Sequence, residues 1–149
     1  MPDAKSQPEV IFMRIPSRLD LLQVLDVVST AVCDRMKFDV DTASQVTMSV
    51  IEAGTNAIQH GHRKNAALTV DVEFSLYPDR LEVDVTDTGP GFDLERVSGD
   101  VTSPEHLFDA RGRGIFIMRA CMDSVSFEFS PAGTVCHLVK LRPAAQAAG

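Results

Sequence analysis

The strongest constraint on the fold is the alternation of apolar and polar residues in two pairs of short segments. Residues 69–76 and 81–85 alternate on either side of a Tyr-Pro-Asp-Arg turn, and residues 125–129 and 135–141 do so around a Pro-Ala-Gly turn. A period of two residues buries one face of a strand and exposes the other. The chain therefore predicts two β-hairpins in a sheet that is covered on one face.

Two segments with helical spacing precede the hairpins. The first helix is expected from an N-cap at Ser17 to about Phe38, and the second from Asp39 or Asp41 to Gly61. Both helices are therefore available to cover the same sheet.

The remaining segments complete the expected order of elements. Residues 10–13 predict a first strand that ends at Pro16, and residues 115–121 predict a short helix. Residues 87–113 show no period, which in a compact domain is typical of a functional or mobile loop. The order β-α-α-β-β-loop-α-β-β favours an α+β fold, a two-layer α/β sandwich with a mixed, mostly antiparallel sheet and helices on one face.

Size and charge limit the function classes. The chain has 149 residues, so we expect one domain over residues 9–142 with flexible tails at 1–8 and 143–149. A formal net charge of -7 disfavours general binding to nucleic acid or anionic membranes. No apolar run reaches the roughly 18–20 residues of a membrane span, and we expect a cytoplasmic protein.

The cysteines and histidines do not form a recognisable metal or disulfide pattern. Cys33, Cys121 and Cys136 are odd in number and far apart, so we expect reduced, buried thiols. His60 and His62 are two residues apart and do not match the i, i+4 pair of a helical zinc site. Metal binding by these side chains is not expected.

Polar residues recur along one stripe of the second helix. Glu52, Asn56 and His60 follow one another at intervals of four, and their neighbours are apolar. The pattern favours a stripe that lines a pocket, with a solvated polar face as the alternative. Gly54 costs this helix about 1 kcal/mol relative to alanine, and a close contact with a neighbouring backbone is one explanation.

Two glycine motifs lie further along the chain. Asp87–Phe92 directly follows a strand and permits a tight turn that approaches a ligand. Arg111–Ile115 places two glycines at the start of a helix, where the dipole favours phosphate. Each motif alone is weak, because the first is common in simple turns and the second has steric explanations.

The joint order of these motifs is specific. E-x-x-x-N-x-x-x-H-G, D-x-G-x-G, G-x-G and G-T-V follow one another from Glu52 to Val135. This series resembles the N, G1, G2 and G3 boxes of the GHKL ATPase superfamily. Residues 49–61 and 112–118 are most similar to the anti-sigma-factor serine/threonine protein kinases, and the resemblance implies a histidine-kinase-type ATPase fold.

The resemblance implies a role for each matched residue. Asn56 would hold Mg²⁺ through its side-chain oxygen, and Glu52 would accept the proton of an attacking hydroxyl. Asp87 would accept a hydrogen bond from the adenine amine, with support from Thr134. The remaining positions implied in binding the cofactor ATP are His60, Gly89, Gly91, Phe92, Gly112, Gly114 and Ile115.

The resemblance also implies a function. Arg111 or Arg113 would neutralise charge on the γ-phosphoryl group, and residues 93–110 would form a lid. The chain would be an ATP-dependent serine/threonine kinase that phosphorylates an anti-anti-sigma antagonist, binds a sigma factor and forms a homodimer. The open alternatives are a non-catalytic ATP-binding regulatory module, which the presence of Glu52 disfavours, and the catalytic domain of a histidine kinase. The latter is disfavoured because the short N-terminal segment leaves no room for a helical dimerisation segment.

Overall fold

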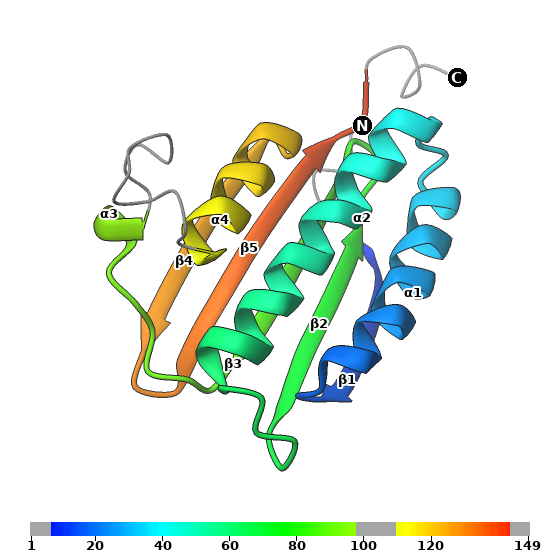
Figure 1. Ribbon diagram of the computed structural model, residues 1–149. Helices are drawn as coiled ribbons and strands as arrows, with labels where there is room; N and C mark the ends of the chain where they lie inside the picture. Colours follow the sequence, from blue (N-terminus) through cyan, green and yellow to red (C-terminus); the bar gives the residue numbers. More distant parts are fainter. Residues whose placement is uncertain (1–6, 98–109, 144–149) are drawn as a thin grey trace.

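The protein folds as one sheet covered on one face by helices. The computed structural model describes residues 7–97 and 110–143. Helices α1, α2 and α4 lie side by side over the same face of the five strands (Figure 1). The strands follow the order β1-β2-β3-β5-β4. The strands are β1 (Glu9–Pro16), β2 (Thr69–Leu76), β3 (Arg80–Asp87), β4 (Ser124–Ser130) and β5 (Gly133–Leu141), and the helices are η1 (Leu19–Leu21), α1 (Leu22–Arg35), α2 (Val40–Thr55), η2 (Asn56–Gly61), α3 (Leu94–Val97) and α4 (Ala110–Cys121).

This arrangement confirms the expected α+β sandwich and its order of elements, to which the structure adds the short helix α3. Each of the four strand pairs within the described residues is antiparallel, so the sheet is not mixed there. Tight turns join β2 to β3 and β4 to β5, and such turns can connect only antiparallel neighbours. Residues 1–6 and 144–149, which form most of the predicted tails at 1–8 and 143–149, and residues 98–109 of the predicted lid lie outside the described residues.

The alternating segments form the floor of the core. Along β2 and β3 every second side chain is buried beneath the helices, as with Phe74 and Leu81. The intervening residues, such as Glu73 and Asp84, lie on the opposite face of the sheet. The period-two pattern therefore fixed which face of each strand the helices cover.

The two first helices begin differently from one another. Asp39 caps α2 as expected, because its carboxylate accepts a hydrogen bond of 2.7 Å from the Thr42 N–H. The expected N-cap role of Ser17 is wrong. Its backbone N–H donates to the Leu68 oxygen, its side chain turns to His62, and a short 3₁₀ turn precedes α1.

Helix α2 continues without a break into η2, a π-helical turn over Asn56–Gly61. Single π-helical turns are rare and often mark functional positions. Gly54, upstream of this turn, lies against α1, where a Cβ would be 2.9 Å from Leu25 Cδ2 and 3.0 Å from Leu22 Cδ2. Close packing of the two helices against side chains, rather than against a backbone, explains this glycine.

The three cysteines are free thiols, and two of them are buried as expected. Cys33, Cys121 and Cys136 are free, with Cys121 only half-buried. Burial raises the pKa of Cys33 to about 11 and that of Cys136 to about 12.

Of the helices in residues 7–97 and 110–143, none has both the length and the hydropathy to cross a lipid bilayer.

Candidate nucleotide site

Two cavities adjoin the junction of α2 and η2, one between these helices and the sheet and the other between them and α4, and Asn56 lines both cavities. The first, which we call the base-end cavity, extends from Asn56 toward Asp87 and Thr134. The second, the phosphate-end cavity, extends from Asn56 toward Glu52 and Arg113 and has a volume of about 210 Å³. Residues from all four predicted motifs therefore line these two cavities, which meet at one asparagine.

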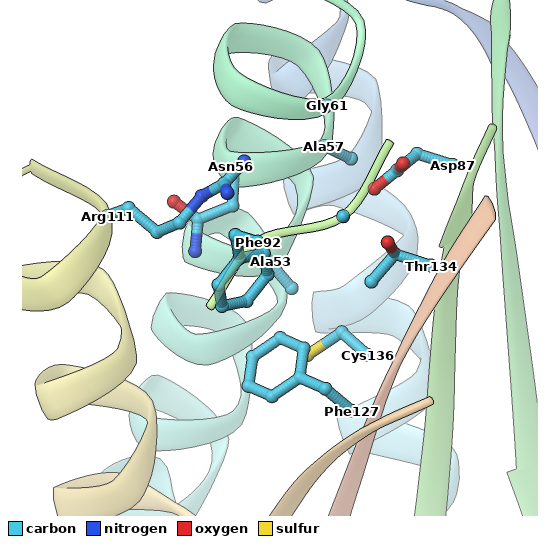
Figure 2. Close-up of a pocket in the computed structure, with 11 residues that line it drawn as sticks. Ala53, Asn56, Ala57, Gly61, Asp87, Phe92, Arg111, Phe127, Thr134 and Cys136 are labelled. Atoms are coloured by element: carbon cyan, nitrogen blue, oxygen red, sulfur yellow. The ribbon is translucent and has the colours of Figure 1, made fainter. Parts of the chain in front are cut away.

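A carboxylate and a hydroxyl from neighbouring strands mark the base end. Asp87 at the end of β3 is paired with Thr134 of β5, and both side chains point into the cavity (Figure 2). Burial raises the pKa of Asp87, an effect partly offset by the 2.8 Å hydrogen bond from the Gly89 N–H and, to a smaller extent, by the neighbouring His62 and Arg111 side chains. The Thr134 hydroxyl is buried and has no hydrogen-bond partner among the described atoms.

The loop after β3 packs directly on the end of η2. A Cβ on Gly89 would lie 2.4 Å from the Gly61 carbonyl oxygen, and a Cβ on Gly61 would lie 2.7 Å from Asp87 Cγ. Side chains at either position would separate the loop from the helix. The two glycines therefore allow the Asp87 carboxylate to lie against the helical backbone.

Aromatic residues narrow the base-end cavity. Phe92 packs edge-on against Phe127 and Phe129, and the guanidinium of Arg111 lies 4.2 Å from the centre of the Phe92 ring. The cavity that remains has a volume of about 20 Å³, which is room for one or two waters. A purine ring can enter this cavity only if Phe92 and Arg111 move.

The phosphate end brings a carboxylate, a cation and a glycine together. Burial raises the pKa of Glu52, and the nearby charge of Arg113 partly offsets this shift. A Cβ on Gly114 would lie 2.9 Å from Glu52 Oε2, so this glycine leaves space for the carboxylate. His60, Gln59 and Thr55 complete the helical wall of the cavity.

The donor set fits a nucleotide with a magnesium ion. The buried acceptor of Asp87 and the unpartnered Thr134 hydroxyl match a purine edge that carries donors and acceptors. Asn56 offers one hard oxygen at the junction of the cavities, and Mg²⁺ commonly takes one or two protein ligands in addition to phosphate oxygens and waters. The described residues contain no cluster of three or more histidine, cysteine or acidic side chains suited to a metal.

The structure separates the two arginines that the sequence left equivalent. Arg111 lies at the base end and Arg113 at the phosphate end. Gly91 lines the base-end cavity, whereas Gly112 lies in the first turn of α4 and Ile115 is buried in the hydrophobic core. Neither Gly112 nor Ile115 lines the two cavities described above.

Several residues at the site were not singled out from the sequence. From the sequence, Gly61 is expected only to end the second helix and the first motif, and His62 is considered only as a metal ligand. Phe127 and Cys136 were read as strand residues, but both line the base-end cavity. The period-two pattern of β4 and β5 was a usable signal for both residues. Side chains that face the helices near Thr134 have to line the same space.

The fold and the paired cavities define a nucleotide-binding domain. The sequence profile of the histidine kinase-like ATPase domain matches residues 15–140 of the chain. The chain belongs to this family. The predicted resemblance to the GHKL superfamily is thereby confirmed over nearly all of the described residues.

Relatives of known name support a narrower grouping. The chain is 29% identical over 136 residues to the serine-protein kinase RsbW of Bacillus subtilis, which covers 88% of this chain and 85% of the relative. It is 31% identical over 132 residues to the serine-protein kinase RsbW of Bacillus velezensis, covering 85% of this chain and 82% of the relative. The similarity therefore extends over most of both chains.

Proposed function

We propose that the protein is an ATP-dependent protein serine/threonine kinase that acts as an anti-sigma factor. It phosphorylates an anti-anti-sigma antagonist and, when not bound to that antagonist, holds a sigma factor in the cytoplasm. The observation that carries this proposal is the position of Asn56 between two cavities, one with a buried acceptor and one with a carboxylate beside an arginine. Similarity to serine-protein kinases named RsbW supports the choice of substrate.

At the base end, Asp87 accepts a hydrogen bond from the exocyclic amine of adenine. A charged acceptor contributes about 1.5–3 kcal/mol and disfavours guanine, which presents a carbonyl at that position. Thr134 uses its hydroxyl on the same edge of the ring. Gly89 and Gly91 let the loop after β3 pass close to the base. Phe92 and Arg111 move to admit the ring.

At the phosphate end, Asn56 would hold Mg²⁺ through its side-chain oxygen, and the ion would supply charge neutralisation on the triphosphate. Gly112 lies in the first turn of α4, where the positive end of the helix dipole favours phosphate. Arg113 lies close enough to Glu52 to affect its pKa, so it is the arginine positioned to stabilise charge on the γ-phosphoryl group. His60 contributes to the wall beside the phosphates.

Glu52 acts as the general base. Its carboxylate accepts the proton of the serine or threonine hydroxyl as the oxygen attacks the γ-phosphorus and the bond to the departing ADP breaks, a contribution of about 10²–10⁴-fold in rate. A pKa raised by burial brings this carboxylate closer to the working pH than an exposed glutamate. Gly114 keeps the space around its oxygen open.

The apolar surface left by the fold supports a homodimer. Val10 and Phe12 are exposed on β1, which is an edge strand, and Val24 and Val27 are exposed on α1. Both elements belong to the N-terminal third of the chain. We place the dimer contact on these elements, away from the nucleotide site.

The test measures binding and transfer separately. Calorimetry with ATP and Mg²⁺ should show wild-type affinity in Glu52→Gln and weakened affinity in Asp87→Asn. Transfer of label from γ-labelled ATP to anti-anti-sigma proteins of the same genome should be lost in Glu52→Gln. Binding without transfer to any of these proteins would favour the regulatory module, and absence of ATP binding would refute the site.

A further inference from the structure

A buried histidine connects the nucleotide loop to the N-terminal part of the fold. His62 follows η2 directly and is 4% exposed. Its Nδ1 lies 3.1 Å from the Ser17 hydroxyl, and its Nε2 lies 2.9 Å from the Thr88 backbone nitrogen and 3.0 Å from the Thr88 hydroxyl. One imidazole therefore contacts two segments that are far apart in the sequence.

The direction of these hydrogen bonds defines the form of the ring. A backbone N–H can only donate, so Nε2 has to be the acceptor for Thr88. The ring proton of the neutral imidazole is then on Nδ1 and is donated to the Ser17 oxygen. A histidine protonated on both nitrogens could not accept from the Thr88 N–H.

Both ends of this connection are fixed to the scaffold. Ser17 is fully buried, and its backbone N–H donates to the Leu68 carbonyl over 2.9 Å. The backbone of His62 donates to the Ala57 carbonyl over 2.8 Å and accepts from the Asn65 N–H over 3.0 Å. The ring thus has little freedom to change its orientation relative to β1 or η2.

The group that the ring holds belongs to the turn that carries Asp87. Thr88 lies between Asp87 and Gly89, and the Gly89 N–H fixes one carboxylate oxygen of Asp87 at 2.8 Å. The adjacent residue Gly61 packs against Gly89 and against the carboxylate itself. The His62 side chain therefore anchors the backbone at Thr88, directly between Asp87 and the glycine whose N–H holds the Asp87 carboxylate.

We propose that His62 is a positioning residue of the nucleotide site, which holds the Thr88 N–H through Nε2 and thereby directs the Asp87 carboxylate toward the adenine amine. This inference rests on the proposed role of Asp87. It assigns no contact between His62 and the nucleotide. The residue acts before binding, because it restricts the Asp87–Gly89 turn to the conformation that accepts adenine.

Two isosteric variants separate the two hydrogen bonds of the ring. In His62→Gln the side-chain oxygen can reach the position of Nε2 and accept from Thr88, but the donor to Ser17 is lost. In His62→Asn the amide can reach the position of Nδ1 and donate to Ser17, but the acceptor for Thr88 is lost. Ser17→Ala removes only the bond that His62→Gln also lacks, and serves as the matched control.

The expected result is a split between these variants. ATP affinity by calorimetry should remain within about twofold of wild type in His62→Gln and Ser17→Ala, and should fall about tenfold in His62→Asn, the scale of one buried hydrogen bond. In the kinase assay, His62→Asn should raise KM for ATP and leave kcat at saturating ATP unchanged. Equal affinities in His62→Asn and His62→Gln would overturn the proposal.

A measurement on the unmodified protein does not depend on how the variants fold. Nitrogen-15 spectra of the imidazole ring should show the neutral tautomer with the proton on Nδ1 for His62 at neutral pH, and a proton on Nε2 would overturn the proposal. Asp87→Asn provides the reference for the site itself. If Asp87→Asn leaves ATP affinity unchanged, the proposed adenine site is wrong; if it weakens affinity and the His62 variants do not differ, only the role of His62 is wrong.

Discussion

The Asp87 carboxylate occupies the space that a side chain on Gly61 would need. A Cβ at residue 61 would lie 2.7 Å from Asp87 Cγ and within 2.9 Å of both carboxylate oxygens. Gly61 ends η2, whereas Asp87 ends β3. A glycine on a helix thus determines where a carboxylate on a strand can point.

Gly61→Ala should weaken ATP binding at least about tenfold, because the methyl group displaces a charged acceptor worth about 1.5–3 kcal/mol. Titration calorimetry measures the effect. Gly54→Ala on the same helix is the control, since its Cβ meets only the ends of two leucine side chains. Equal losses of affinity in the two variants would show that the helix, rather than the carboxylate, is sensitive to a methyl group.

Gly114→Ala should act on phosphoryl transfer. The added Cβ would lie 2.9 Å from Glu52 Oε2, so the carboxylate has to move away from its position beside Arg113. We expect kcat to fall about tenfold or more with ATP affinity nearly unchanged. A variant that loses affinity and retains kcat would contradict the assignment of Gly114 to the catalytic end.

The two arginines should have different kinetic effects. Arg113→Gln should lower kcat on the order of 10²-fold, because it removes a cation from the end of the site where charge develops. Arg111→Gln should mainly change KM for ATP, since Arg111 lies on the Phe92 ring at the base end. Steady-state kinetics of both variants with one protein substrate makes the comparison, and a reversed pattern would exchange the two roles.

The rate of transfer should fall on the acidic side as Glu52 is protonated. Because burial raises the pKa of Glu52 above 4.5, the midpoint of this loss should lie at a higher pH than for an exposed glutamate. In Arg113→Gln the midpoint should move to still higher pH, since the offsetting positive charge is gone. A midpoint that is the same in both proteins would mean that another group limits the rate.

Asp87→Asn should stabilise the protein without nucleotide. A raised pKa means that the folded state favours the protonated acid. The stabilising contribution of Asp87 to the folded state is therefore fully present below pH 3.8 and is lost as the pH rises through the raised pKa. The asparagine variant avoids this loss. Its melting temperature should exceed that of wild type at neutral pH, and the difference should shrink as the pH is lowered to about 4.

Periodic segments and ordered motifs made the fold and much of the site predictable. The period-two segments gave both hairpins, and the stripe of Glu52, Asn56 and His60 was expected to line a pocket, as it does. The family resemblance placed Asp87 and Thr134 at one end of the site, and the structure pairs them across two strands. A local sequence pattern predicts the position of a residue when that position depends only on the helix or strand that contains it.

The errors and omissions concern contacts between distant segments. Serine is a common N-cap residue, but the Ser17 hydroxyl is hydrogen-bonded to His62, which is 45 residues away in the sequence. No spacing rule reveals that pairing, nor the packing of Gly89 on Gly61. The separation of Arg111 from Arg113 likewise depends on how α4 is placed beside α2, which a sequence pattern does not specify.

The π-helical turn over Asn56–Gly61 has a consequence for the evolution of chain length in this family. Glu52 and Asn56 precede or begin the turn, whereas Gly61 and His62 end or follow it. An α-helix rotates about 100° per residue, so a single deletion within the turn would rotate the downstream pair away from β3. Substitutions at most of these positions preserve that phase, but an insertion or deletion does not. We therefore expect lineages of this kinase to keep the number of residues in this turn constant even where positions without a role in the site, such as Ile58, vary in identity.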